Sequence, residues 1–254
     1  MTTTLAGKIA VVTGASKGIG KHTALRLAAL GATVVVHYRG SKAAAEEVVR
    51  QIEGNGGSAF LLQSDLSDPA APKQFYERLD PELQRRFGSN RFDILVNNAG
   101  AGTRAVIEDV SEEALDETLQ VDLKAPFFLI KYASSRLRDG GRIVNVSSMG
   151  TRVAYPEMAA YSPAKAGLEA LTLLLAPHFG PRGITVNAVL PGATATDMNP
   201  AAQDPVRSVQ LAQTIALKRV GQPEDIADII AFLVSDAARW VTGQRIDASG
   251  GQRI

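Results

Sequence analysis

The chain has 254 residues, a formal net charge of +1, 45% hydrophobic residues and 21% charged residues. These values are ordinary for a globular protein with one large core, and they argue against a broad surface for nucleic acid or acidic membrane. The absence of cysteine excludes disulfides, thiol catalysis and cysteine-bound metals. The few histidines lack metal-binding spacing, so we predict no metal site.

The first residues lack a basic segment followed by an apolar stretch, so we expect no secretory signal. No run approaches the ~18 apolar residues that a membrane-spanning helix needs. A cytoplasmic protein with no membrane partner and no nucleic-acid partner is therefore the expectation.

Short runs rich in valine and isoleucine alternate with amphipathic stretches. Predicted strands lie at 9–12, 33–36, 59–62, 94–96, 142–146, 184–189 and 245–247, with helices between them, for example at 21–30, 43–54 and 111–137. Continuous apolar runs are typical of strands that are buried on both faces of a parallel sheet. The alternation without a linker or repeat predicts one α/β domain over 1–254. We expect a doubly wound parallel sheet of about seven strands with helices on both faces.

A glycine-rich segment lies between the first predicted strand and the first helix. It reads Thr13-Gly14-Ala15-Ser16-Lys17-Gly18-Ile19-Gly20. Glycine allows a tight turn, and backbone N–H groups at the start of the helix can approach a pyrophosphate. The G-x3-G-x-G spacing differs from the standard dinucleotide fingerprint, but its place between strand and helix favours a Rossmann-type dinucleotide site.

The end of the second predicted strand indicates which dinucleotide is preferred. It reads His37-Tyr38-Arg39-Gly40-Ser41, with no carboxylate before Glu46. A carboxylate at this place binds a ribose hydroxyl of NAD, whereas an arginine suits a 2′-phosphate. We expect Arg39 to pair with that phosphate and Lys17 to approach it from the glycine segment. NADPH is therefore predicted over NADH, and the alternative is that both cations are solvated surface groups.

Tyr161 and Lys165 are four residues apart, which places them on one face of a helix. A neighbouring ammonium favours the phenolate, so we expect the pKa of Tyr161 to fall from its usual ~10. Such a pair suits proton transfer to or from an alcohol or carbonyl oxygen. We expect Pro156 to be the first residue of this helix, Pro163 to kink it or remove a hydrogen bond, and Pro177 to bend or end it.

Five motifs occur in order along the chain: the glycine segment, Asn97-Asn98-Ala99-Gly100, Ser148, Tyr161-x3-Lys165 and Pro191-Gly192. Together they resemble the short-chain dehydrogenase/reductase family over about residues 7–251. Within it the chain is similar to the 3-oxoacyl-(acyl-carrier-protein) reductase type and related microbial ketoreductases, with fatty acid biosynthesis as the implied setting.

The resemblance implies roles for the matching residues. Tyr161 would donate a proton to the substrate oxygen as hydride reaches the carbonyl carbon, Lys165 would lower the pKa of Tyr161 and bind the nicotinamide ribose, and Ser148 would hydrogen-bond the substrate oxygen. With the glycine segment and the second strand end, the implied cofactor contacts are Gly14, Ser16, Lys17, Gly18, Ile19, Gly20, Tyr38, Arg39, Ser41, Asp65, Leu66, Asn97, Ala99, Gly100, Tyr161, Lys165, Pro191, Gly192, Thr194 and Thr196.

The sequence departs from the family at Asp122, which stands where the family usually has an asparagine that anchors a water near the lysine. Aspartate has nearly the same shape but carries a charge and lacks the amide donor. Two hypotheses follow for this fourth candidate catalytic residue. Either its backbone carbonyl anchors the water and activity survives, or the proton relay is altered and turnover is slower or shifted in pH.

The substrate is less well indicated than the reaction. We expect residues 194–220 to form a mobile lid, and Tyr155 and Met149 to border the pocket. An acyl carrier would need a basic surface near the entrance, for which Arg138, Arg142 and Arg182 are candidates. Free ketones, 3-oxoacyl thioesters and sugars all stay open as substrates.

Three functions compete at this point. The first is an NADPH-dependent carbonyl reductase, the second is an NADP-dependent alcohol or sugar dehydrogenase that runs in the oxidising direction, and the third is a non-catalytic NADPH-binding protein. The resemblance also implies a homotetramer with contacts through 111–137, 157–179 and 240–254, although burial within one subunit explains the apolar residues there equally well.

Overall fold

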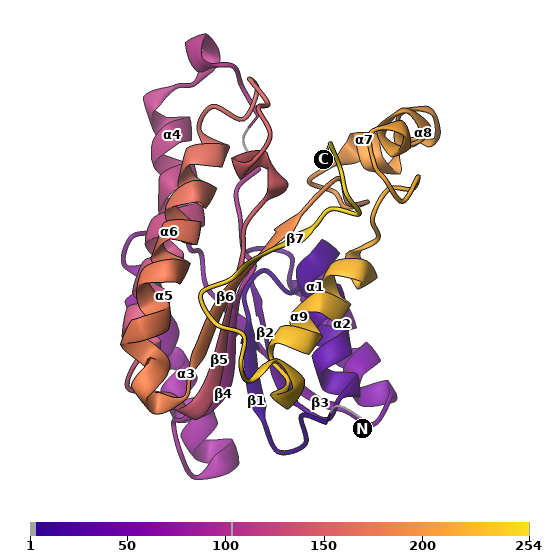
Figure 1. Cartoon of the computed structure of the whole chain (residues 1–254). Helices are drawn as coiled ribbons and strands as arrows, with labels where there is room; N and C mark the ends of the chain where they lie inside the picture. The colour runs from indigo at the N-terminus through magenta and orange to yellow at the C-terminus, as the bar shows by residue number, and fades with distance from the viewer. Residues whose placement is uncertain (1–3, 103, 254) are drawn as a thin grey trace.

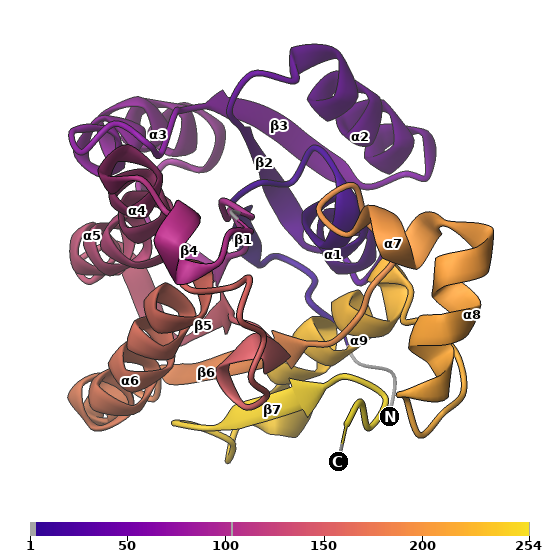
Figure 2. The same cartoon turned by 90° about the horizontal axis from the view of Figure 1, so that it is seen from above.

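The computed structural model describes residues 4–102 and 104–253. Their strands form one parallel sheet in the order β3-β2-β1-β4-β5-β6-β7 (Figures 1 and 2), as the alternating sequence pattern predicted. The strands are β1 Ile9–Val12, β2 Thr33–Tyr38, β3 Ser58–Gln63, β4 Phe92–Asn97, β5 Leu137–Val146, β6 Thr185–Pro191 and β7 Arg245–Ala248. The helices are α1 Gly18–Ala29, α2 Lys42–Gly54, α3 Ala71–Phe87, α4 Glu112–Leu119, α5 Ala125–Ala133, α6 Tyr161–Phe179, α7 Pro200–Gln203, α8 Pro205–Gln213 and α9 Pro223–Leu233.

Each face of the sheet has its own hydrophobic core. Successive side chains of a strand point to opposite faces. Val12 therefore packs in the core under α1, α2 and α9, whereas Val11 packs in the core under α3, α5 and α6. Figures 1 and 2 show the two groups of helices on opposite sides of the sheet. Burial on both faces explains why the strand segments are continuously apolar.

The strand order reverses at β1, which pairs with β2 on one side and with β4 on the other. The chain therefore winds outward in both directions from this strand. In such sheets a crevice opens at the carboxyl ends of the strands at the reversal point, and ligands bind there. The loops that follow β1, β4, β5 and β6 all begin at this edge, and they carry most of the predicted site residues.

The predicted helix at 111–137 is wrong as one continuous helix. It divides into α4, a π-helical turn at Gln120–Lys124, and α5, after which β5 begins at Leu137. A π turn is a local insertion in a helix and is frequent at functional sites. The turn buries two polar residues, Gln120 and Asp122, in the protein interior.

The helix that carries Tyr161 is not kinked as expected. It begins at Tyr161 itself, so Pro156 lies before the helix and Pro163 lies in its first turn. The first backbone N–H groups of a helix have no partner within the helix, so proline is tolerated there. Pro177 lies two residues before the end at Phe179, in agreement with a breaker near that end.

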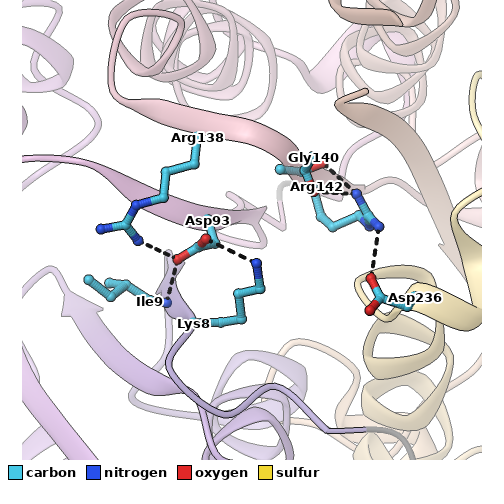
Figure 3. Close-up of polar contacts among 8 residues, drawn as sticks. Lys8, Ile9, Asp93, Arg138, Gly140, Arg142 and Asp236 are labelled. Atoms are coloured by element: carbon cyan, nitrogen blue, oxygen red, sulfur yellow. Dashed lines mark hydrogen bonds and ion pairs between the residues drawn. The ribbon is translucent and has the colours of Figure 1, made fainter. Parts of the chain in front are cut away.

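A buried carboxylate at the amino end of β4 collects several donors at the edge of the sheet opposite the crevice (Figure 3). Asp93 accepts from Arg138 at 2.7 Å and from the backbone N–H of Ile9 at 2.9 Å, and Lys8 lies 3.4 Å away. Nearby, the guanidinium of Arg142 donates to the Gly140 carbonyl and lies 3.4 Å from Asp236. These contacts join the starts of three neighbouring strands.

The position of this cluster corrects one expectation. Arg138 and Arg142 lie near the start of β5, and Arg182 precedes β6 and pairs with Asp139 at 2.8 Å. All three are therefore at the far edge of the sheet, away from the crevice. They cannot form a basic surface at the entrance of a substrate pocket there.

The described part of the chain has no helix that is both long and apolar enough to cross a bilayer. Within the same ranges, no cluster of three or more histidine, aspartate or glutamate side chains is arranged to hold a metal ion.

Candidate active site

The turn after β1 is so tight that it depends on glycine. A Cβ atom on Gly20 would lie 2.2 Å from the Gly14 carbonyl oxygen and 2.4 Å from the side-chain nitrogen of Asn98. The amide of Asn98 donates to the carbonyl of Thr13 at 2.9 Å and to that of Gly14 at 3.2 Å. The segment after β4 therefore fastens the glycine segment to the centre of the sheet.

His37, at the end of β2, holds the same turn from the other side. The backbone N–H of Gly14 donates to Nδ1 of His37 at 3.0 Å, so Nδ1 acts as the acceptor. Nε2 then carries the proton and donates to the carbonyl of Ser64 at 3.0 Å. Burial lowers the pKa of His37 to about 4, although the Ser64 carbonyl and Asp65 oppose this, so the ring is neutral at ordinary pH. The sequence analysis did not predict this role of His37. The histidine that follows three valines in β2 was the feature that could have indicated it.

A cavity of about 460 Å³ opens beside His37 at the ends of β2 and β3, and Ser16, Ser41 and Leu66 contribute to its lining. Arg39 crosses it: Nε lies 3.0 Å from Asp65 and Nη1 lies 3.3 Å from Glu117. Partial burial opposes the charge on Arg39, but the two carboxylates outweigh it and raise the pKa of the guanidinium. The exposed guanidinium of Arg39 therefore lies at the place predicted for a 2′-phosphate. Glu117 was not among the predicted residues.

Three of the predicted cofactor residues do not line the cavity that contains Arg39. Lys17 lines a different cavity and lies 3.7 Å from Asp197, so the structure does not bring it beside Arg39. Tyr38 is part of the hydrophobic core and lines neither cavity. Asn97 is buried and donates to the side-chain oxygen of Asn145 at 2.8 Å, which joins β4 to β5. Asn97 therefore stabilises the sheet and is not a cavity-lining group.

The larger cavity, of about 710 Å³, brings together Ser148, Tyr161 and Lys165. The hydroxyl of Ser148 lies close enough to the phenol of Tyr161 to influence its ionisation. Nζ of Lys165 lies 5.5 Å from the centre of the Tyr161 ring, one helical turn along α6. Ser148 also accepts from the N–H of Gly150 at 3.0 Å, which fixes its hydroxyl at the end of β5. The predicted order of serine, tyrosine and lysine therefore becomes one wall of a cavity.

Lys165 has two partners inside the protein. Nζ lies 2.9 Å from Oδ1 of Asp122 and donates to the carbonyl of Val146 at 2.9 Å. Oδ2 of Asp122 accepts from the N–H of Ala101 at 3.1 Å. Gly100 faces this pair, since a Cβ atom there would lie 2.8 Å from Asp122. The carboxylate lines neither cavity and acts on the site only through these neighbours.

The predicted lowering of the Tyr161 pKa is wrong for this site. Burial raises the pKa of Tyr161, Lys165 lowers it, and Asp122 raises it again, so that the net direction is upward. Burial also opposes the ammonium of Lys165, but Asp122 and Tyr161 outweigh it and raise the lysine pKa. The pKa of Asp122 is raised by burial, although Lys165 counteracts this. Tyr161 is therefore held in its protonated form.

Ser147, next to the catalytic candidate, is engaged elsewhere. Its hydroxyl donates to Oε1 of Glu169 at 2.6 Å, and the hydroxyl of Thr151 donates to the same oxygen at 2.7 Å. Glu169 lies on α6 one turn beyond Lys165 and is buried. This contact fixes the segment after β5 against the helix and leaves Ser148 to face the cavity.

Methionine and tyrosine side chains form much of the substrate side of the large cavity. Met149, Met158 and Met198 all line it, together with Tyr155. Met198 comes from the segment before α7 and packs against Gly102, where a Cβ atom would lie 2.7 Å from its Cγ. The guanidinium of Arg253 lies over the ring of Tyr155, 4.8 Å from its centre. Residues far apart in the sequence thus enclose one apolar space.

The two cavities adjoin each other, because Gly14, Ala99, Gly100 and Gly102 line both. A single elongated ligand can therefore reach from Arg39 to Tyr161 along the glycine segment. Gly18, Ile19, Pro191, Gly192, Thr194 and Thr196 line the half that contains Tyr161. The tight glycine cradle and the cation at its far end fit a phosphorylated dinucleotide.

Comparison with known proteins agrees with this geometry. The family described as Enoyl-(Acyl carrier protein) reductase matches residues 14–253. The chain is 41% identical to the 3-oxoacyl-(acyl-carrier-protein) reductase FabG of Staphylococcus aureus over 96% of its length and 97% of that protein. The chain belongs to the short-chain dehydrogenase/reductase family. As a member it is an oxidoreductase, which the sequence motifs had indicated.

Two solved structures of short-chain reductases are similar to it throughout. The reductase LugOII, which catalyses keto-reduction at C1 during lugdunomycin biosynthesis, is 46% identical with a TM-score of 0.94 and covers 98% of this chain and 99% of its own. The angucycline C-6 ketoreductase LanV with bound NADP is 44% identical with a TM-score of 0.94, covering 99% of this chain and 97% of its own. LanV has also been solved with both NADP and rabelomycin.

Proposed function

We propose that this protein reduces a ketone to a secondary alcohol with NADPH. The observation that carries the proposal is that Ser148, Tyr161 and Lys165 line one cavity, which adjoins a second cavity, lined by Arg39, along the glycine segment. When bound, NADPH supplies the hydride. The protein orients the ketone, donates the proton and excludes water.

The residues divide this work by position. Ser148 hydrogen-bonds the ketone oxygen and stabilises the charge that develops on it. Tyr161, which lines the same cavity as Ser148, donates its phenolic proton to the same oxygen. Lys165, held by Val146 and Asp122, presents its remaining N–H toward the place of the nicotinamide ribose. Segment 194–220 acts as the lid, with Met198 closing the space above Gly102.

Arg39 supports NADPH as the cofactor. Its side chain is 61% exposed and lines the second cavity. The residues at the end of β2 include no aspartate or glutamate that would bind a ribose hydroxyl instead. A guanidinium gives charge-assisted hydrogen bonds to a phosphate. LanV binds NADP, which agrees with this choice. We expect a higher kcat/KM with NADPH than with NADH, and the opposite order would contradict the assignment.

For the substrate we propose a rigid, largely apolar ring ketone ahead of a 3-oxoacyl thioester. Three methionines and Tyr155 line the substrate side, and methionine adapts its shape and makes favourable contacts with aromatic rings. The arginines considered for an acyl carrier lie at the opposite edge of the sheet. The keto-reduction at C1 by LugOII and the angucycline C-6 ketoreductase activity of LanV lend further support to a ketone substrate, whereas the likeness to FabG favours the thioester.

The test is NADPH oxidation across fused-ring aromatic ketones, simple ketones, sugars and 3-oxoacyl thioesters. Tyr161→Phe removes the proton donor without changing the packing of the ring, so we expect a loss of ~10²-fold or more in ketone reduction. NADPH binding, followed by nicotinamide fluorescence, should persist in this variant and serves as the folding control. Undiminished reduction by Tyr161→Phe would contradict the assignment, and NADPH binding without turnover on any ketone would favour a binding protein.

A further inference from the structure

The ion pair between Asp122 and Lys165 lies inside the protein beside Tyr161. Its side chains are only 0% and 3% exposed, and the two charged atoms are 2.9 Å apart. The second carboxylate oxygen is held by the N–H of Ala101 at 3.1 Å. Because the carboxylate is fixed at both oxygens and shielded from solvent, salt and water screen it far less than a surface charge.

The other charged groups near Tyr161 are exposed to solvent, unlike Asp122 and Lys165. Arg104, from the loop after β4, is half-exposed and pairs with Glu157 at 3.2 Å. Lys17 and Asp197 form a largely exposed pair across the mouth of the cavity, and Arg253 lies over the ring of Tyr155. Solvent screens such exposed pairs. The buried charge beside the phenol is therefore set by Lys165 and Asp122.

We propose that Asp122 neutralises Lys165 and so keeps Tyr161 protonated through the alkaline range. This rests on the proposed ketone reduction and adds a positioning residue that acts on Tyr161 through Lys165. An unpaired lysine would pull the phenol toward phenolate, whereas a neutral pair removes most of that pull. The upward direction of the Tyr161 pKa, caused first by burial, agrees with this role.

The reaction makes the protonation state of Tyr161 decisive. In reduction, hydride adds to the carbonyl carbon, the π electrons of the C=O bond move to oxygen, and that oxygen takes the proton of Tyr161. The resulting phenolate recovers a proton from water. In the reverse reaction the phenolate takes the proton of the alcohol as hydride leaves the carbon. Reduction therefore needs Tyr161 protonated, and oxidation needs it ionised.

Asp122→Asn tests the proposal, because it removes the charge and keeps the size and an oxygen that can accept from Ala101. We expect the alkaline limb of ketone reduction and the rising limb of alcohol oxidation to move together to lower pH. One buried charge at this range corresponds to a shift of about one pH unit or more. Unchanged limbs, or limbs that move to higher pH, would overturn the proposal.

A second readout needs no substrate, so it separates this proposal from the proposed reaction. The tyrosinate absorbance of the wild-type protein minus that of Tyr161→Phe, recorded against pH, isolates the ionisation of Tyr161. The same difference on the Asp122→Asn background should show ionisation at lower pH. Asp93→Asn, which removes a different buried carboxylate, at the far edge of the sheet (Figure 3), should leave the curve unchanged.

The wild-type difference curve decides the matter even where Asp122→Asn fails to fold. Near-ultraviolet circular dichroism and NADPH binding show whether that variant is folded. If Tyr161 of the wild-type protein ionises below the ordinary ~10 of a free tyrosine, the pair does not protect it and the proposal is wrong. Ionisation above that value supports it.

Discussion

A single histidine supports the cofactor side of the site at the residue scale. His37 accepts from Gly14 and donates to Ser64, so it connects the turn after β1 to the ends of β2 and β3. This arrangement requires a neutral ring, since protonation at Nδ1 would place two donors against each other. The glycine turn, which we propose as the cradle for a pyrophosphate, thus depends on the protonation state of His37.

This dependence predicts a loss of stability in acid. The pKa of His37 is about 4 in the folded protein against 6.5 for the free side chain, so the unfolded chain binds more protons between these values. The contribution is therefore complete above the higher value and is lost as pH falls toward the lower one. Its slope is about 1.4 kcal/mol per pH unit at most, or roughly 3 kcal/mol in all. Urea unfolding over a pH series measures it.

Two variants identify His37 as the source of the slope. His37→Asn keeps a polar side chain without a titration in this range, so the free energy of unfolding should depend less on pH. His178→Asn is the matched control, because His178 is exposed near the end of α6 and should leave the slope as in the wild-type protein. A slope that survives in His37→Asn would show that other groups cause it.

At the scale of elements, the strand–turn–helix unit formed by β1, the glycine turn and α1 could be predicted from the sequence, because glycines between a strand and a helix have few other uses. The effects of burial on helix geometry and on side-chain pKa values could not be predicted from the sequence. The π turn at Gln120–Lys124 depends on what α4 and α5 pack against, and the fall expected for the Tyr161 pKa ignored the desolvation of the phenol. The prediction of a kink at Pro163 was wrong because the first residue of a helix is difficult to predict. The helix begins at Tyr161, which places Pro163 in the first turn, where proline is tolerated.

The glycine turn gives a prediction at this scale. Gly20→Ala places a methyl group about where the Gly14 carbonyl lies, and backbone cannot move aside as a flexible side chain can. We expect a loss of ~1–3 kcal/mol in stability and a large loss of NADPH affinity. Thermal unfolding and nicotinamide fluorescence measure the two effects.

Gly54→Ala is the matched control for Gly20→Ala. Gly54 ends α2, and a Cβ atom there would meet nothing within 4 Å. Alanine at such a site is neutral or slightly stabilising. If both variants behaved alike, the tight contact between α1 and the turn after β1 would not be what restricts position 20.

At the scale of the whole molecule, the described surface carries large apolar side chains that the single chain leaves uncovered. Phe127 on α5, Leu173 and Leu174 on α6, and Trp240 after α9, which is 96% exposed, are among them. Exposed apolar groups of this size commonly mark contacts between protein molecules. They lie in the segments from which the sequence resemblance implied a homotetramer.

We therefore predict a homotetramer in solution with two kinds of contact. Light scattering after size-exclusion chromatography should give about four times the chain mass for the wild-type protein. Leu174→Asp should reduce it to a smaller species, because a charge cannot be buried unpaired at an interface. Leu217→Ser, which changes an exposed leucine after α8, should keep the tetramer. A monomeric wild-type protein would contradict the prediction.

The ordered motifs predicted the fold, because strand ends are few and most of the motifs follow one. They also named Ser148, Tyr161 and Lys165, which the structure places in one cavity. The cavity lining was harder to predict. His37, Glu117 and Met158 enter the cavities through side chains whose direction depends on packing between distant segments. The misplaced expectation for Arg138 has the same origin, since β5 begins earlier than its valine-rich part suggested.

One stripe along α6 has a consequence for how this chain can change. Tyr161, Lys165 and Glu169 follow one another at intervals of one helical turn. Tyr161 is the proposed proton donor, Lys165 forms the buried ion pair, and Glu169 holds the segment after β5. Inserting or deleting one residue between them would rotate the later groups by about 100° around the helix axis. The three side chains therefore need to stay on the same face of α6. We expect residues 161–169 to tolerate substitutions between them far better than an insertion or a deletion.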